Sequence, residues 1–329
     1  MRTSTVCFRR IAAAALPASL LACSSLAIGQ EYPSRPIRVI VAFTPGGTSD
    51  IVARLSSQLL AEAFGRPSFV ENRPGAGGTV GTELAAKSAP DGHTLVVGHI
   101  GTLAVNPTLY PKIGYDPVRD FAAITLISKA PSIMVVHPSL PVKTVKEFVA
   151  LARKRPGALE YGSPGSGSAG HLLMSYLTLL SKTDLLHVPY KGTGPALVDL
   201  MAGRISTVFT GTPGILPHVQ SGRLRIIGVS SAQRIASMPE VPTIAESGLP
   251  GFDVTQWWGI LAPAGTPRPI VMRVNEAFGS ALKSADIRAR LAADGAEPAH
   301  STPEAFQAFI RSEIERWAPV IRASGAKVD

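Results

Sequence analysis

The chain has 329 residues and a formal net charge of +9; 45% of its residues are hydrophobic and only two are cysteines. This length provides two domains of ordinary size with hydrophobic cores and excludes a small disulfide-stabilised scaffold. The basic residues do not cluster with aromatic residues, so we predict no nucleic-acid partner. The positive charge raises the local concentration of anions, which favours an anionic ligand.

The first 29 residues have the pattern of a secretory signal peptide. Three arginines precede an apolar run over residues 11–21, and Ala27-x-Gly29 offers a small-residue cleavage site. The run is shorter than the roughly 20 residues that span a bilayer. We therefore predict cleavage after Gly29 and export of the mature protein to the periplasm.

Two other interpretations of this segment remain open. The tetrapeptide LLAC loosely resembles a lipoprotein box, which would place a lipid on Cys23, and an Arg-Arg pair loosely resembles a twin-arginine signal. We favour the unlipidated form, because Leu21 is bulky for the position two before a lipidated cysteine. Since Cys7 also lies in the removed segment, the mature chain has no thiol for a disulfide, a metal site or a nucleophile.

In the mature chain, short apolar runs rich in Val and Ile alternate with longer segments of helical period. This alternation predicts an α/β fold with parallel-type sheets flanked by helices. The clearest unit is a buried strand over residues 37–43, a glycine-rich turn and a helix over residues 49–64. Further strands are predicted over residues 67–71, 95–99, 133–137, 159–162, 185–190, 207–210 and 224–229. Further helices are predicted over residues 80–88, 145–155, 171–181 and 195–202.

Changes in composition near Pro131 and Ser230 predict two crossings of the chain between two lobes. We expect residues 30–130 and 231–329 to form lobe 1, and residues 131–230 to form lobe 2. We expect the protein to be a monomer.

Two loops combine glycine with hydroxyl residues where a predicted strand leads into a helix. Their residues are Pro45, Gly46, Gly47 and Thr48 in the first loop and Gly165, Ser166, Gly167 and Ser168 in the second. In open α/β sheets ligands lie beyond the carboxyl ends of strands, where helix N-termini offer unpaired N–H groups. We predict that both loops bind a carboxylate through hydrogen bonds, without needing a salt bridge.

Several residues near these loops also have interpretations that need no ligand. Glycine-rich turns often only allow tight packing, and Asp50 in the first helical turn complements the helix dipole. His99 and His171 are typical of core or capping histidines. The pair Trp257-Trp258 is more typical of a core than of a pocket wall.

Residues 165–170 also fit the Gly-x-Gly-x-x-Gly fingerprint of dinucleotide sites. Such a site needs an acidic residue after the following strand, whereas Asp184 precedes the strand over residues 185–190. A serine hydrolase is disfavoured because Ser168 has Ser166, not glycine, two residues before it. The seven histidines lack metal-ligand spacing, so we predict no cofactor, no metal and no catalysis. An exported α/β enzyme with an unrecognised site remains the alternative.

Six segments occur in an order that is typical of one protein family. They are YPSRPIRVIVAFTPGGTSDIVAR (32–54), ENRPGAGGTVGTELAAKSAPDGHTL (71–95), NPTLYPKIGYDPVRDF (106–121), YGSPGSGSAGHL (161–172), VPYKGTGPAL (188–197) and APAGTP (262–267). In these segments the chain resembles the substrate-binding proteins of tripartite tricarboxylate transporters, the Bug or TctC family. The resemblance implies a two-lobed type II periplasmic binding fold joined by two crossover strands, with a small carboxylate held between the lobes. It also implies a membrane permease as partner.

The resemblance also brings the loop of Thr102 into the predicted pocket, and Tyr190 and Thr193 are expected at the rim of the second lobe. Neighbouring Lys191 is equally compatible with a solvent-facing position. The predicted ligand-binding residues are Pro45, Gly46, Gly47, Thr48, Asp50, Thr102, Ser163, Gly165, Ser166, Gly167, Ser168, Tyr190, Thr193 and Thr210.

The chain differs from the family that it resembles at Ser206 and Thr210, where family members commonly carry aspartate. A buried ammonium group on an amino acid would need an anionic partner, and Thr210 supplies only a hydroxyl. We therefore predict a carboxylate without an amino group, such as a dicarboxylate, a hydroxy acid or an aromatic acid. Asp50 would supply the missing charge if it turned inward.

Overall fold

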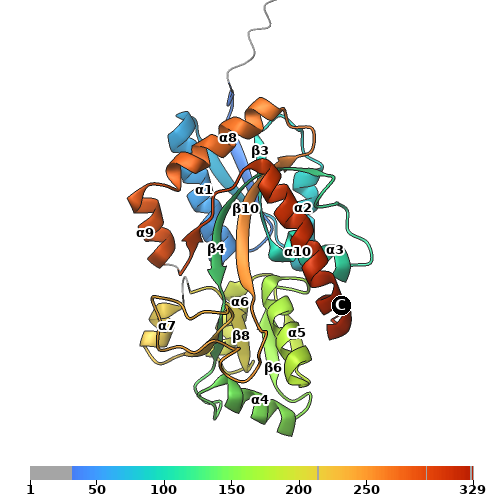
Figure 1. The fold of residues 1–329 in the computed structure, drawn as a ribbon, viewed down its shortest axis with the longest axis vertical. Helices are drawn as coiled ribbons and strands as arrows, with labels where there is room; N and C mark the ends of the chain where they lie inside the picture. Colours follow the sequence, from blue (N-terminus) through green and yellow to red (C-terminus); the bar gives the residue numbers. More distant parts are fainter. Residues whose placement is uncertain (1–31, 213–214, 294, 327, 329) are drawn as a thin grey trace, which may run out of the picture.

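The computed structural model describes residues 32–212, 215–293, 295–326 and 328, which form two α/β units placed end to end (Figure 1). The predicted signal peptide, including Cys23 and its alternative lipid site, lies outside the described residues. In the described ranges, no helix has the length and apolar character that a membrane crossing requires.

The first unit is built on a mixed six-stranded sheet with the order β11-β4-β10-β3-β1-β2. Its strands are β1 (Ile37–Val41), β2 (Ser68–Asn72), β3 (Thr94–His99), β4 (Phe121–Pro131), β10 (Thr255–Pro263) and β11 (Glu297–Pro298). β1 runs parallel to β2 and β3, whereas β10 runs antiparallel to β3 and β4. Every residue of β3 is buried, as expected for a central strand covered on both faces.

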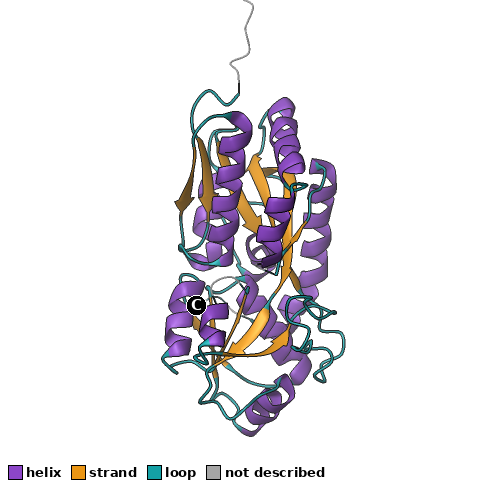
Figure 2. Cartoon of the chain, turned by 90° about the vertical axis from the view of Figure 1, so that its left-hand side faces the viewer, coloured by secondary structure: helices purple, strands orange, loops and turns teal. Residues whose placement is uncertain are grey.

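Helices cover both faces of this sheet (Figure 2). They are α1 (Thr48–Phe64), α8 (Arg268–Ala281) and α9 (Ala285–Ala293) on one face, and α2 (Thr79–Ala86), α3 (Asn106–Leu109) and α10 (Pro303–Ser324) on the other. Alternate residues of β1 point to the two cores, because side chains alternate along a strand. Val39 and Val41 pack with α1 and α8, while Ile40 belongs to the core that contains α10.

The second unit is built on a mixed five-stranded sheet with the order β7-β6-β8-β5-β9. Its elements are β5 (Ile133–Val136), α4 (Val145–Lys154), β6 (Glu160–Ser163), α5 (Ala169–Ser181), β7 (Leu186–Pro189), α6 (Thr193–Met201), β8 (Thr207–Thr210), α7 (Leu216–Gln220) and β9 (Arg225–Val229). β6 is parallel to β7 and β8, whereas β5 is antiparallel to β8 and β9. Each sheet therefore has one antiparallel strand between parallel ones, β10 in the first and β5 in the second, and the first sheet also ends in β11, which is antiparallel to β4.

The predicted strands and helices agree with the observed ones to within two residues at each end. The expectation of parallel-type sheets needs correction at β5, β10 and the two-residue edge strand β11, which are antiparallel to their neighbours. β5 and β10 each follow a crossing from the other unit, not a helix packed on their own sheet, and so enter antiparallel. β4 and β10 are not among the predicted strands; together they carry the chain between the units.

The segment between β9 and β10 packs on the second unit. Ile235, Met238 and Val241 share a core with strands β5 and β8. The two ends of the segment lie side by side, as shown by the hydrogen bond of 2.8 Å from the Val254 N–H to the Ser230 carbonyl. The chain therefore enters β10 after a segment that packs on the second sheet.

Serine side chains join the two crossings. The Ser132 N–H donates to Ser230 Oγ at 2.8 Å, and the Ser230 N–H donates to the Ser132 carbonyl at 2.8 Å. Ser230 Oγ donates in turn to the Val254 carbonyl at 2.6 Å, and Gln256 Nε2 donates to Ser132 Oγ. Because both serines are fully buried, these bonds fix the crossing chains against each other.

We expect Ser230→Ala to lower the free energy of unfolding by about 1 to 3 kcal/mol, because it leaves a buried amide and a buried carbonyl unpaired. Chemical denaturation of the mature protein measures the change. Ser231→Ala is the control, since Ser231 Oγ bonds to the Gln233 carbonyl at an exposed position; its effect should stay within about 0.5 kcal/mol. Equal effects of the two substitutions would contradict this role for Ser230.

Candidate ligand-binding site

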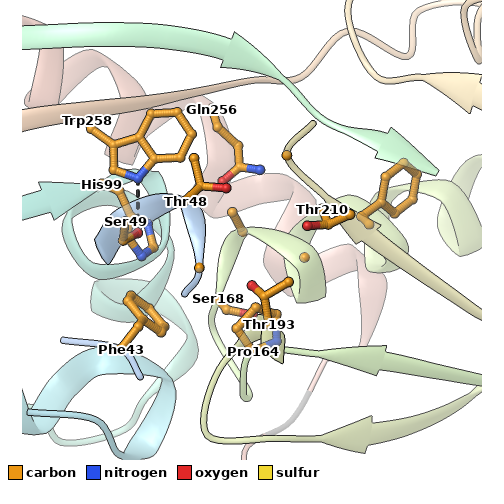
Figure 3. Close-up of a pocket in the computed structure, with 15 residues that line it drawn as sticks. Phe43, Thr48, Ser49, His99, Pro164, Ser168, Thr193, Thr210, Gln256 and Trp258 are labelled. Atoms are coloured by element: carbon orange, nitrogen blue, oxygen red, sulfur yellow. Dashed lines mark hydrogen bonds between the residues drawn. The ribbon is translucent and has the colours of Figure 1, made fainter. Parts of the chain in front are cut away.

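A pocket lies between the two units, where the carboxyl ends of β1, β3, β6 and β8 come together (Figure 3). It has a volume of about 40 Å³. Its walls are formed by Phe43, Gly47, Thr48, Ser49, His99, Pro164, Ser168, Ala169, Gly170, Thr193, Phe209, Thr210, Gly211, Gln256 and Trp258. These lining residues include no lysine, arginine, aspartate or glutamate. Any charge on a ligand must therefore be met by neutral groups.

Three helices begin at this pocket. α1, α5 and α6 start at Thr48, Ala169 and Thr193, and all three residues line it. The first N–H groups of a helix have no intrahelical acceptor, and the helix end carries about half a positive charge. Gly47 and Gly192 precede α1 and α6 without any side-chain cap, so no side chain competes for those amides. The arrangement favours an anion.

Hydroxyl groups add further donors around the same space. Thr48, Thr193 and Thr210 line the pocket. Ser168 Oγ accepts from the His171 N–H at 3.4 Å, and Ser49 Oγ accepts from Trp258 Nε1 at 3.0 Å (Figure 3). A serine that accepts in this way keeps its own hydrogen for another partner.

His99 contributes a neutral imidazole to the pocket wall. Its ring centroid lies 4.8 Å from that of Phe43, and its Nδ1 accepts from the Gly101 N–H at 2.7 Å. Burial lowers the pKa of His99 to about 3, so the ring is uncharged near neutral pH. A neutral ring that accepts through Nδ1 carries its proton on Nε2. His99 therefore provides one N–H donor.

Asp50 is held outside the pocket wall. Its Oδ2 accepts from the Gly46 N–H at 3.0 Å and from Arg54 Nε at 2.9 Å, and its Oδ1 accepts from Asn72 Nδ2 at 2.9 Å. Burial by itself would raise the pKa of Asp50, but the hydrogen bonds from Arg54, Asn72 and Gly46 keep it below its usual range. The carboxylate thus fixes the loop before α1 and does not line the pocket.

Five predicted residues come together around the pocket: Gly47, Thr48, Ser168, Thr193 and Thr210. Pro45, Gly46, Gly165 and Gly167 lie in the flanking loops and are not lining residues.

Four other predicted residues support these walls through hydrogen bonds. Thr102 Oγ1 donates to the His99 carbonyl at 3.3 Å, and the Ser166 carbonyl accepts from Tyr110 Oη at 2.7 Å. Ser163 Oγ contacts His187 Nε2 at 2.6 Å, while Tyr190 Oη donates to Asp199 at 2.7 Å. A direct ligand contact for any of these four stays a prediction.

The pocket also contains residues that were not predicted to line it, namely Phe43, Ser49, His99, Pro164, Ala169, Gly170, Phe209, Gly211, Gln256 and Trp258. His99 and Trp258 are buried, as residues of a core are, and both also line the pocket. Gln256 and Trp258 come from β10, and the position of that strand between β3 and β4 is what brings them to the site.

The two units touch directly beside the pocket. Tyr110 follows α3 in the first unit, and its bond to the Ser166 carbonyl reaches the loop before α5 in the second. A side chain at Gly192 would overlap with Thr44 Oγ1 and lie 3.3 Å from the Thr44 backbone nitrogen. Only glycine allows the start of α6 to approach the loop after β1 this closely.

We expect Asp50→Asn to reduce stability most above about pH 4. Because the folded-state pKa of Asp50 is lowered, its ionised form stabilises the fold above the unfolded-state pKa, and this contribution is lost as the pH falls through the folded-state pKa. The substitution should lower Tm at pH 7 and flatten the decline of Tm on acidification. Melting curves between pH 2.5 and pH 7 test this, with the exposed Asp184→Asn as control. Parallel pH profiles for wild type and Asp50→Asn would contradict it.

The chain is similar in sequence to one family of known proteins. The model of the "Tripartite tricarboxylate transporter family receptor" matches residues 52–326. Protein BugT of Bordetella pertussis is 38% identical over 298 residues, covering 90% of this chain and 91% of that protein.

Two solved structures with similar folds contain small acids. R. palustris Rpa4515 with adipate has a TM-score of 0.88 and 35% identity, covering 91% of this chain and 100% of that one. MatC from Rhodopseudomonas palustris with bound malate has a TM-score of 0.84 and 36% identity, covering 88% of this chain and 100% of that one. With the family model matched along most of its length, the chain belongs to the tripartite tricarboxylate transporter receptor family, the Bug or TctC family.

Proposed function

We propose that this protein captures a small carboxylate between its two units, in the periplasm, for delivery to a permease of the tripartite tricarboxylate type. The observation that carries the proposal is the convergence of α1, α5 and α6 on one pocket without charged side chains. Hydrogen bonds to a charged group contribute about 1.5 to 3 kcal/mol each, so three or four account for micromolar affinity. Adipate and malate in the two R. palustris relatives support a carboxylate ligand.

The proposed lobes follow the two sheets. Lobe 1 takes residues 30–130 and the chain from β10 onward, and lobe 2 takes residues 131–254, since the segment before β10 packs on the second sheet. The serine-bonded crossings then act as the hinge, and the ligand favours the closed state through contacts with both lobes. We propose a monomer, exported after cleavage of residues 1–29 and without lipid on Cys23.

The protein is proposed to bind without catalysis. A serine–histidine contact does lie beside the site, between Ser163 Oγ and His187 Nε2. Ser163 is fully buried and not a lining residue, and its hydroxyl also accepts from the Gly165 N–H at 3.1 Å. A nucleophile must reach its substrate, which this serine does not. The pair supports the loop before α5.

The ligand is proposed to lack an amino group. Thr210 lines the pocket, Asp50 is committed to the loop, and no acidic side chain is among the lining residues. A desolvated ammonium group would remain unpaired there, which is unfavourable by several kcal/mol.

Calorimetry with succinate, malate, adipate, citrate and benzoate, against aspartate and glutamate, should show binding of at least one plain acid and none of the amino acids. Thr48→Val keeps the side-chain shape and removes a hydroxyl, so it should weaken binding by about 1 to 3 kcal/mol. Thr178→Val, on the distal part of α5, should leave affinity unchanged. Tight binding of an amino acid with no detectable plain acid would refute the proposal.

Gly192→Ala should impair closure. Its φ of +165° is extended backbone that alanine also adopts, so the variant should fold normally, but the new methyl group meets Thr44 across the interface. We expect at least tenfold weaker binding and a smaller ligand-induced decrease in radius of gyration by small-angle scattering. In the control Gly194→Ala, the nearest atom would be the Pro45 carbonyl oxygen at 4.0 Å. Wild-type closure and affinity in Gly192→Ala would contradict a role for the close approach of Gly192 to Thr44.

A further inference from the structure

A second cavity adjoins the ligand pocket. It has a volume of about 200 Å³, against about 40 Å³ for the pocket itself. Its walls are formed by Thr48, Ile51, Val52, Arg54, Leu55, Gln58, Ser128, Ala130, Gly211, Trp258, Arg290, Leu291 and Ala296. Thr48, Gly211 and Trp258 line both spaces, so the cavity lies next to the carboxylate site. Gly211 comes from the second unit, which places the cavity at the same interface.

The interior of this cavity is mainly apolar. Val52 and Leu55 of α1, Leu291 of α9 and Ala296 before β11 are all buried and form its wall. Such a surface binds hydrocarbon by removing it from water. The pocket beside it, at about 40 Å³, has room for only a few water molecules, since one ordered water needs about 10 to 15 Å³. The pocket accommodates a carboxylate group, whereas the body of a ligand needs the second space.

The outer wall of the cavity carries positive charge. Arg54 is paired with Asp50, but the exposed Arg290 only donates to Gln58 Oε1 at 3.2 Å and forms no ion pair within the described chain. A second anionic group at the far end of a ligand would be met by this guanidinium.

We propose that the bound acid passes Trp258 and places its body in the second cavity. Its first carboxylate lies at the helix N-termini, its hydrocarbon chain lies among Val52, Leu55 and Leu291, and its far acidic end lies toward Arg290. The inference rests on the proposed function and narrows it to α,ω-dicarboxylates with several methylene groups. A shorter acid such as succinate places fewer methylene groups in the second cavity.

Calorimetry of the mature protein with succinate, adipate, suberate and hexanoate tests this directly. Each buried methylene should improve affinity about fourfold, so adipate should bind at least tenfold more tightly than succinate. Adipate should also bind at least fivefold more tightly than hexanoate, which lacks the second carboxylate. Succinate binding with no gain for adipate or suberate would overturn the inference and leave the proposed function standing. Failure of every acid to bind would overturn both.

Two substitutions locate the effect in the cavity. Ala296→Leu fills it and should remove the adipate gain while leaving succinate affinity within twofold; Ala293→Leu adds the same atoms at an exposed position outside the cavity. Arg290→Gln, at an exposed site that does not endanger folding, should weaken adipate at least threefold and leave hexanoate unchanged. Arg288→Gln on the same helix is its control. Wild-type affinity for adipate in both Ala296→Leu and Arg290→Gln would overturn the inference.

Discussion

The structure depends on bringing backbone amides from two separate units to one point. A helix N-terminus carries only about half a charge, so a single one binds an anion weakly in water. In the proposed site, three of them enclosed in one pocket, with hydroxyls from Thr48, Thr193 and Thr210, take the place of the charged side chain that a shallower site would need. The remaining architecture holds those amides in place.

Each loop is held by side chains that do not line the pocket. In the first unit, Asp50 is bonded to the Gly46 amide, Asn72 and Arg54. In the second unit, His171 Nδ1 accepts from the Gly167 N–H at 2.9 Å, and its ring stacks on His187 with centroids 4.3 Å apart. In the proposed function, these residues would act on the ligand indirectly, by fixing the direction in which the amides point.

Much of this arrangement could be predicted from the sequence because it is local. A buried strand, a glycine-rich turn and an amphipathic helix are contiguous in residues 37–64, and their order alone places Gly47 and Thr48 at a strand's carboxyl end. The contributions of Gln256 and Trp258 depend on β10 lying between β3 and β4, which is a long-range pairing that no local pattern specifies. The orientation of Asp50 also depends on a distant partner, Asn72.

The absence of charged residues among those that line the pocket has a consequence for release. His99, the titratable side chain of the wall, stays neutral until strongly acidic pH, so no proton taken up near neutrality weakens the hold on a carboxylate. In the proposed function, release of the bound acid then depends on the separation of the two units. If α5 and α6 move away from α1, the shared positive potential falls with distance and water replaces the amides.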